Sequence, residues 1–304
     1  MNLPEDFDPP AGQAQTLAPG LQRILAPNPS AMTWRGTNTY LLGTRQLAVI
    51  DPGPSDPAHL RAILGSLTAG QSISHIFVTH AHLDHAPLAA DLARETGAPI
   101  LAYGDALAGR SAVMQGLAES GLAGGGEGVD HSFRCDIALA DGDTVQGDGW
   151  QITAHWTPGH FGNHMAFQWG KAVFSGDLVM GWASSLVSPP DGDLTQFMAS
   201  CAKLRALDPK ILHPGHGAPV TRPTQRIDWL ITHRQAREAA ILAALAQGPA
   251  TAEALARSIY TETPPALLPA AARNVFAHLV DLTGKNRVKP QGSLAYTAVF
   301  KTVS

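Results

Sequence analysis

The segment His80-Ala81-His82-Leu83-Asp84-His85 places four side chains of metal-ligating type within six residues. It follows the apolar, β-branched run Ile76–Thr79, which predicts a buried strand ending directly at the first histidine. In an extended loop the first two histidines point to the same side, and after a turn the aspartate and the last histidine can face a second ion. Zinc binds imidazole nitrogen and carboxylate oxygen. The segment therefore predicts most of a two-metal site.

Three later turns repeat this arrangement, because in each a His or Asp follows the end of a predicted strand. They are Thr157–His160, Ser175–Asp177 and His213–Gly217. Loops at strand ends carry function on a rigid scaffold, and four such turns can meet at one edge of a pair of sheets. We therefore expect the ligand-type residues of all four segments to converge.

The residues divide into two sets with one shared ligand. The first predicted site takes His80, His82 and His160, and the second takes Asp84, His85 and His216. Asp177 joins them, since a carboxylate has two oxygens to share, and a hydroxide bridges the ions as well. The expected cofactor is two Zn²⁺ ions, with other divalent metals as alternatives.

Such a centre predicts hydrolysis. Zinc lowers the pKa of its bound water to about 7, so hydroxide is available to attack a carbonyl or phosphoryl centre. Asp84 is the expected catalytic residue that accepts or relays the proton. His164 either donates to a substrate oxygen or makes an ordinary hydrogen bond, and Asn38 is a second expected substrate contact. The loop with Trp182, Ser184 and Ser185 either lines the cleft or is purely structural.

Four motifs carry a resemblance to a known family. His-x-His-x-Asp-His at 80–85, Thr-Pro-Gly-His at 157–160, Ser-Gly-Asp at 175–177 and Pro-Gly-His-Gly at 214–217 resemble, in that order, the metallo-β-lactamase superfamily. The resemblance implies an αββα sandwich with the metals at one sheet edge. It also implies that Asp51 steadies the metal-binding loop, although from the residues alone Asp51 is equally well explained as a turn residue.

Within that superfamily the chain is most similar to the β-lactamase-like-protein subfamily, which carries a C-terminal winged helix. The segments Gly36–Tyr40 and Asp51–Gly53 fit it. That subfamily includes an endoribonuclease and fungal thioester hydrolases. This sequence departs from its pattern at Ala86-Pro87, where glycines are frequent, and at His213, where an aromatic residue is common. These departures leave the expected metal ligands intact, and the resemblance does not decide between the substrate classes of the subfamily.

The sequence after about Pro223 predicts a different domain. Helical patterns cover 227–246, 251–259 and 267–282, and two short strand-like runs follow within 288–300. Three helices and a terminal hairpin are typical of a winged helix. We therefore predict a catalytic α/β domain over residues 1–224 and a small winged-helix domain over residues 225–304.

Composition narrows the class of protein. A formal net charge of -4 argues against coating nucleic acid by charge alone, and the two cysteines form neither a disulfide framework nor a metal pair. Residues 1–15 lack the features of a signal peptide, and no apolar run is long enough to span a membrane. The expected location is the cytoplasm, without membrane association.

The substrate stays open between two classes. It is either a phosphodiester in single-stranded RNA or a small acyl ester or thioester. The alternative to an enzyme is a winged-helix nucleic-acid-binding protein with a structural metal site. The expected recognition helix offers Arg273, Asn274 and His278 but also Asp281, which is sparse for reading DNA. We therefore expect this domain to pack over the cleft, to shape the pocket or to form a homodimer contact. The sequence argues against a flavodiiron protein, because a flavodiiron site would favour Glu at the position of His82.

Overall fold

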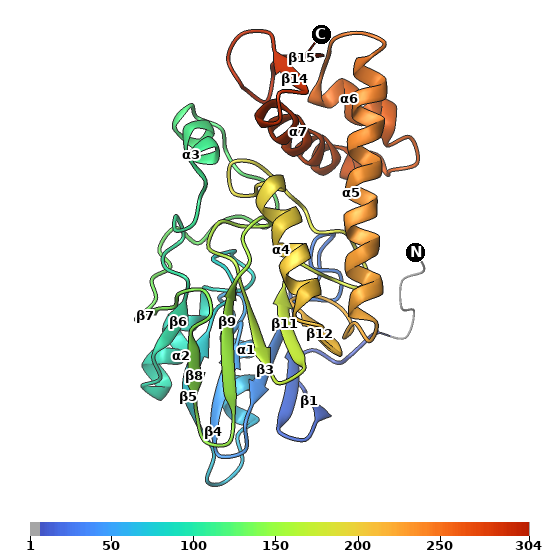
Figure 1. The fold of residues 1–304 in the computed structure, drawn as a ribbon. Helices are drawn as coiled ribbons and strands as arrows, with labels where there is room; N and C mark the ends of the chain where they lie inside the picture. The colour runs from blue at the N-terminus through green and yellow to red at the C-terminus, as the bar shows by residue number, and fades with distance from the viewer. Residues whose placement is uncertain (1–6, 304) are drawn as a thin grey trace.

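The computed structural model describes residues 7–303. Of the N-terminal stretch that argued against a signal peptide, residues 1–6 lie outside the described residues, as does residue 304. Two sheets stand face to face with helices outside them, and a helical domain sits above one end of the sheets (Figure 1).

The first sheet has seven strands in chain order, β1 to β7. They are β1 (Ala14–Ala18), β2 (Leu21–Leu25), β3 (Asn38–Leu42), β4 (Gln46–Ile50), β5 (Ser72–Phe77), β6 (Ile100–Ala102) and β7 (Ile137–Ala138). Pairing is antiparallel from β1 to β4 and parallel from β4 to β7. The parallel strands β4 and β5 therefore end at the same edge of the sheet.

The second sheet has the order β12-β11-β10-β9-β8. Its strands are β8 (Thr144–Gln146), β9 (Gln151–Trp156), β10 (Met165–Trp169), β11 (Ala172–Gly176) and β12 (Ile211–Pro214). Only β11 and β12 run parallel. Gly170 and Lys171 form the hairpin turn between β10 and β11.

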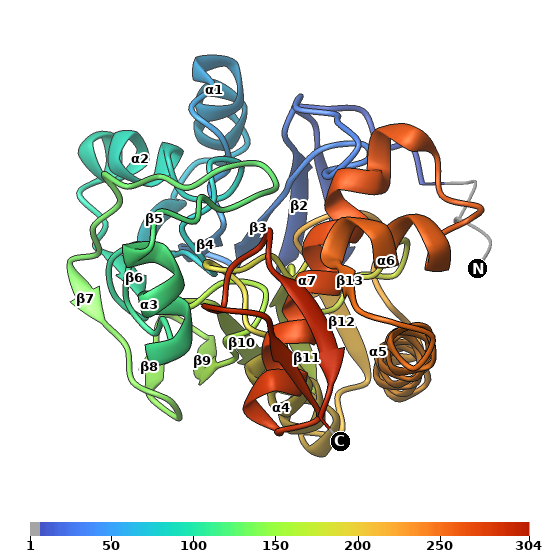
Figure 2. The same ribbon diagram turned by 90° about the horizontal axis from the view of Figure 1, so that it is seen from above.

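Large apolar side chains fill the space between the sheets. Phe77 of the first sheet packs edge-on against Phe167 of the second, and Tyr40 packs on Phe174. The helices α1 (Pro57–Gly65) and α2 (Leu88–Thr96) cover the outer face of the first sheet, and α4 (Leu194–Ala206) covers the second (Figures 1 and 2). The expected αββα sandwich is confirmed.

The C-terminal part has a core of its own. Its elements are α5 (Pro223–Leu245), β13 (Ala250–Thr251), α6 (Ala252–Ile259), the 3₁₀ turn η1 (Pro265–Leu267), α7 (Leu268–Gly284), β14 (Val288–Pro290) and β15 (Val299–Thr302). The three strands form a sheet in the order β13-β15-β14. Thr251 caps α6 by accepting a hydrogen bond from the Ala254 amide. Met114 and Leu117 of α3 (Ala112–Glu119) pack into this core from the first domain.

The helix α5 belongs to both domains. Ile227 and Leu230, near its start, pack against the outer face of the second sheet, whereas Ile241 and Leu245 lie in the C-terminal core. The predicted division between residues 224 and 225 lies just inside the start of this helix, and it stays a prediction. Among residues 7–303, no helix is both long enough and apolar enough to cross a membrane.

Candidate metal centre

Seven predicted ligands gather at one edge of the sandwich. His80 to His85 follow β5, His160 lies between β9 and β10, Asp177 follows β11, and His216 follows β12. All seven side chains are buried. The four turns therefore converge as the strand ends predicted.

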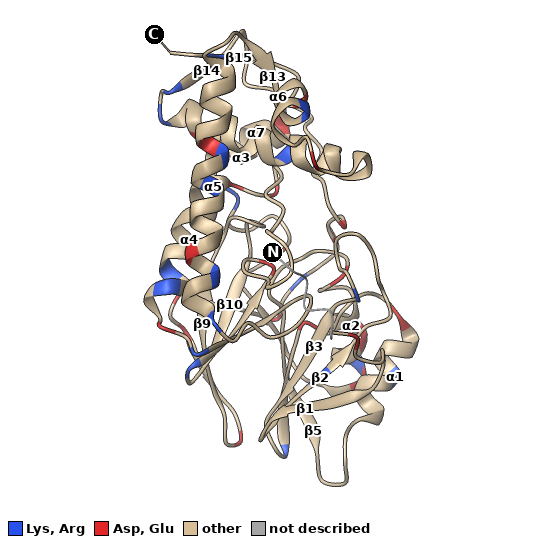
Figure 3. Cartoon of the chain, turned by 90° about the vertical axis from the view of Figure 1, so that its right-hand side faces the viewer, with Lys and Arg blue, Asp and Glu red and all other residues tan. Residues whose placement is uncertain are grey.

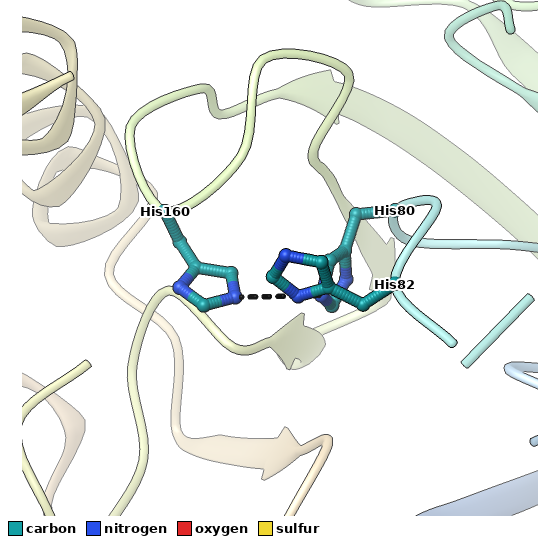
Figure 4. Close-up of side chains that lie close together, drawn as sticks. All are labelled: His80, His82 and His160. Carbon is teal, nitrogen blue, oxygen red and sulfur yellow. Dashed lines mark hydrogen bonds between the residues drawn. The ribbon is translucent and has the colours of Figure 1, made fainter. Parts of the chain in front are cut away.

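The first triad consists of histidines alone. Nε2 of His80 lies 2.9 Å from Nδ1 of His82, and Nε2 of His160 lies 3.1 Å from the same nitrogen. The ligand atoms of the three residues all lie within 4.8 Å of one another. Figure 4 shows the rings from two separate loops turned toward one another. This spacing is suited to three ligands of one ion.

The second triad combines a carboxylate with two histidines. Oδ2 of Asp84 lies 3.1 Å from Nε2 of His216 and 3.4 Å from Nε2 of His85. The two Nε2 atoms are 3.3 Å apart. The three side chains again satisfy a mutual limit of 4.8 Å.

Asp177 lies between the triads. Its Oδ2 is 3.2 Å from Nε2 of His216 and 3.7 Å from Nε2 of His160, and its Oδ1 is 3.5 Å from Nε2 of His85. One carboxylate thus faces ligands of both triads, which is the position that a shared ligand requires.

The cluster fits divalent metal ions. Buried polar atoms ordinarily have hydrogen-bond partners, because leaving them unpaired costs free energy. Here both carboxylate oxygens of Asp84, Oδ1 of Asp177 and Nε2 of His82 are buried without a hydrogen-bond partner. A set of imidazole nitrogens and carboxylate oxygens is what zinc and similar divalent metals bind.

The comparisons with known proteins agree with this geometry. The family model described as the metallo-beta-lactamase superfamily matches residues 32–216. The chain belongs to the metallo-β-lactamase superfamily. A second model, the beta-lactamase associated winged helix domain, matches residues 251–296, so the predicted winged helix is confirmed. The prediction of a hydrolase is confirmed at the level of this superfamily.

Two curated relatives are similar over most of the chain. The beta-lactamase-like protein 2 homolog of Drosophila melanogaster is 32% identical, over 88% of this chain and 89% of that protein. The atrochrysone carboxyl ACP thioesterase of Aspergillus fumigatus is 32% identical, over 78% of this chain and 68% of its own length.

Two solved structures share the fold. A metallo-beta-lactamase family protein from Thermus thermophilus aligns with a TM-score of 0.76 at 24% identity, covering 95% of this chain and 100% of that one. A beta-lactamase domain protein from Burkholderia ambifaria aligns with a TM-score of 0.78 at 22% identity, covering 98% and 96%.

In this member of the superfamily, backbone carbonyls and one carboxylate orient the histidines from outside. Nδ1 of His160 donates to the Leu186 carbonyl at 2.7 Å, and Nδ1 of His216 donates to the Gly36 carbonyl at 3.1 Å. Nδ1 of His85 bonds to the Asp51 carboxylate at 2.9 Å. A histidine that donates through Nδ1 keeps its Nε2 lone pair free, and here each Nε2 faces the cluster.

Asp51, which the superfamily resemblance implied to steady the metal-binding loop, contacts both Thr79 and His85. Its φ is 52°, in the left-handed region, directly after β4. Oδ1 accepts from the Thr79 amide at 2.7 Å, and Oδ2 accepts from the Thr79 hydroxyl at 2.8 Å. Asp51 therefore ties the start of the 80–85 segment to His85. Sequence reasoning missed Thr79, for which the only available signal was its place directly before His80.

The pKa values of the histidines differ between the two triads: they are lowered in the first triad and raised in the second. Burial lowers the pKa of His82 to about 3 and that of His80 well below its ordinary value, so these imidazoles are neutral. In the second triad, burial would lower the pKa of His216, but Asp177 and Asp84 raise it to about 10. Burial would also raise the pKa of Asp177, but His216 and His85 hold it well below its usual range. A metal ion would replace the protons of that second group.

The two expected substrate contacts lie behind the centre and not among the residues that line the cavity. His164 is fully buried, its Nδ1 lies 2.9 Å from the Thr157 hydroxyl, and its Nε2 accepts from the Asp177 amide at 3.2 Å. Asn38 is also fully buried, and its amide group donates to the carbonyls of Pro214 and Gly217. Both side chains point into the loops that carry Asp177 and His216. They brace the centre from behind instead of lining its open side.

A cavity of about 260 Å³ opens beside the centre and extends to the C-terminal domain. From the centre it is lined by His82, Asp84, His160, Asp177 and His216. The C-terminal domain contributes Tyr260, Thr263, Leu267, Ala270, Ala271 and Asn274. Of the loop residues that the sequence singled out, Trp182 and Ser184 line the cavity, whereas Ser185 is buried behind it. The expectation that the winged helix packs over the cleft agrees with this arrangement.

Proposed function

We propose that this chain is a two-metal hydrolase that cleaves the carbonyl–heteroatom bond of a small acyl ester or thioester. In this proposal the two metal sites are His80, His82 and His160 on one side and Asp84, His85 and His216 on the other, with Asp177 shared. Two divalent cations, with Zn²⁺ as the first candidate, would supply a hydroxide nucleophile and polarise the substrate carbonyl.

The residues of the chain have distinct tasks in this reaction. Asp84 faces the cavity with both oxygens free of hydrogen bonds, so it is placed to accept a proton as the nucleophile attacks. Asp51 fixes the direction of His85, and Asn38 fixes the loop around His216. Ligand positions that are fixed in advance need no rearrangement when charge develops on the substrate oxygen.

The composition of the cavity favours an acyl substrate over RNA. Neither Lys nor Arg is among its described lining residues, whereas Glu127 and Asp191 are. A groove that follows a phosphate backbone requires positive charge. The larger apolar lining side chains away from the centre are Met32, Met180, Trp182, Leu186 and Leu267. Such a surface suits an uncharged acyl or aryl group. The name of the Aspergillus fumigatus relative, a thioesterase, supports the same class.

The orientation of the winged helix argues against the nucleic-acid-binding alternative. The recognition helix α7 is turned toward the catalytic domain, where Arg273 donates to the Pro189 carbonyl and Asp281 accepts from Thr195. His278 is fully buried. On the side that Figure 3 shows, basic and acidic residues are mixed along α5. A helix used in this way cannot enter a DNA groove.

A substrate screen on purified protein tests the proposal. The panel holds acyl thioesters and p-nitrophenyl esters of increasing acyl length and a single-stranded RNA, each with and without a chelator. We expect chelator-sensitive thioester or ester turnover that is lost in His82→Ala and kept in His131→Ala, which changes an exposed histidine. RNA cleavage without acyl hydrolysis would contradict the substrate class, and unchanged turnover in His82→Ala would contradict the metal centre.

A further inference from the structure

The loop over residues 177–188, which begins with Asp177 and follows β11, is held from behind by the C-terminal domain. From α5, Arg226 donates through Nε to the Met180 carbonyl and through Nη2 to the Ala183 carbonyl, each at 2.6 Å. Arg234, about two turns further along the same helix, donates through Nη2 to the Ser185 carbonyl. Guanidinium groups of α5 thus bind three carbonyls of the 177–188 loop.

Asn274 of α7 completes this contact. Its Oδ1 accepts from the Val187 amide at 3.0 Å and from Nη1 of Arg234 at 2.9 Å. Arg234 is 2% exposed, and its Nη1 and Nη2 donate hydrogen bonds to Asn274 and to the Ser185 carbonyl. A buried cation without such partners would be costly, so Asn274 and Arg234 hold each other as well as the loop.

The same loop also contacts two candidate ligands. The carbonyl of Leu186 accepts the hydrogen bond from Nδ1 of His160 at 2.7 Å. The hydroxyl of Ser185 lies within hydrogen-bond distance of the carbonyl of Asp177. The Asn274 contact is made by Val187, the next residue after Leu186 in the chain. A shift of this segment would therefore move the group that sets the direction of the His160 ring.

We infer that Asn274 and Arg234 are positioning residues for the metal centre. In this inference the recognition helix α7 holds the 177–188 loop in position instead of binding in a nucleic-acid groove. This inference rests on the proposed metal centre. Substitution of a residue that holds a metal ligand in place typically lowers metal affinity by about 10–100-fold. Because Asn274 acts one residue away from the carbonyl that His160 uses, we expect an effect near the lower end, about tenfold.

The experiment compares Zn²⁺ affinity in four variants of the full chain by competition with a chromophoric chelator. Asn274→Leu removes the acceptor at nearly constant size, and Asn274→Ala removes it without adding bulk. Asn274→Asp keeps an acceptor for Val187 and Arg234. Thr195→Val is the matched control, because it removes the 2.6 Å bond from Thr195 to Asp281 at the other end of α7 without touching the 177–188 loop.

We expect Zn²⁺ affinity to fall about tenfold in the Leu and Ala variants and to stay within about threefold of the original in the Asp and Thr195→Val variants. Thermal unfolding of the metal-free proteins reports whether each variant is folded. If Asn274→Leu does not fold, the Zn²⁺ affinity of Asn274→Ala tests the inference. Equal weakening in all four variants overturns the inference, since it would reflect general loosening of α7. Unchanged affinity in every variant overturns it as well. Absence of Zn²⁺ binding by the original protein would instead contradict the proposed function.

Discussion

Asp51 accepts a hydrogen bond from Nδ1 of His85 at 2.9 Å, across 34 residues of sequence. The bond joins the end of β4 to the 80–85 segment after β5, two parallel neighbours in the first sheet. The same carboxylate also accepts from the Thr79 amide and hydroxyl. One buried anion therefore fixes both ends of the segment that carries most of the candidate ligands.

Asp51→Asn should weaken metal binding while preserving the fold. Asparagine tolerates the φ of 52° at this position better than most residues, so the backbone should stay as it is. The amide can accept on only one side, which leaves either Thr79 or His85 facing a second donor. We expect roughly a 10–100-fold loss of Zn²⁺ affinity, measured by chelator competition, with an unchanged far-ultraviolet circular dichroism spectrum. A loss of Zn²⁺ affinity of less than about twofold, which is far smaller than that range, would show that Asp51 is only a turn residue.

Asp84→Ala should change the stoichiometry of metal binding. Asp84 belongs to one triad only, and its two oxygens have no hydrogen-bond partner in the described structure. Removing it should leave the His80, His82 and His160 triad intact. We expect bound metal to fall from about two equivalents to about one after dialysis against metal-free buffer, as measured by elemental analysis, and hydrolysis to fall by at least about 100-fold. Retention of two equivalents would contradict the proposed division of ligands.

The convergence of the ligands could be predicted from sequence because each ligand-bearing segment follows the end of a strand. A strand such as Ile76–Phe77 is recognisable from its apolar and β-branched residues, and the ends of parallel neighbours meet at one edge. What local sequence does not encode is the direction of a side chain. His164, in the loop before β10, and Asn38, at the start of β3, both lie beside the centre, yet both point away from the cavity and into the backbone behind it.

Contacts between the domains had no local signal. From sequence, Asn274 is only a polar residue on an expected recognition helix, and its partner Val187 is 87 positions away. Arg234 is only one charge in a long Ala-rich helix, although in the structure it is buried under the catalytic domain. Both roles depend on the angle at which α5 and α7 lie against the sandwich. That angle is set by the packing of apolar helix faces against the sandwich. Hydrophobic periodicity identifies the apolar face of a helix, but it does not identify the surface against which that face packs.

Ala270→Leu should shorten the range of acyl groups that the enzyme accepts. Ala270 lines the end of the 260 Å³ cavity that the winged helix forms, away from the candidate ligands. A leucine there should fill part of that space and exclude long chains, while the metal centre stays unchanged. We expect kcat/KM for an octanoyl thioester to fall about tenfold or more, and that for an acetyl thioester to change less than about threefold. Ala236→Leu, on the exposed face of α5, is the control and should leave both values unchanged. Equal loss for both substrates in Ala270→Leu would argue against a size limit at this end.

His278 should make the protein sensitive to mild acid. It is buried with neither ring nitrogen hydrogen-bonded, and burial, assisted by nearby Arg234, lowers its pKa to about 3. In the unfolded chain the pKa returns to about 6.5, so between these values the unfolded state binds one more proton than the folded state. The stabilising contribution of neutral His278 is therefore complete above about pH 6.5 and is lost as the pH falls toward about 3.

His278→Phe removes the titratable group and keeps a ring of apolar character in the core. At up to about 1.4 kcal/mol per pH unit, the original protein should lose about 2 kcal/mol more than the variant between about pH 7 and pH 5. Urea unfolding at each pH measures the difference, with both proteins metal-free so that proton release from the ligands does not differ between them. Other buried histidines, such as His59 with a pKa lowered to about 4 by burial, are present in both proteins and cancel in the comparison. Parallel pH profiles for the two proteins would mean that His278 finds a proton-accepting partner in the folded state, and that its site is less apolar than its surroundings indicate.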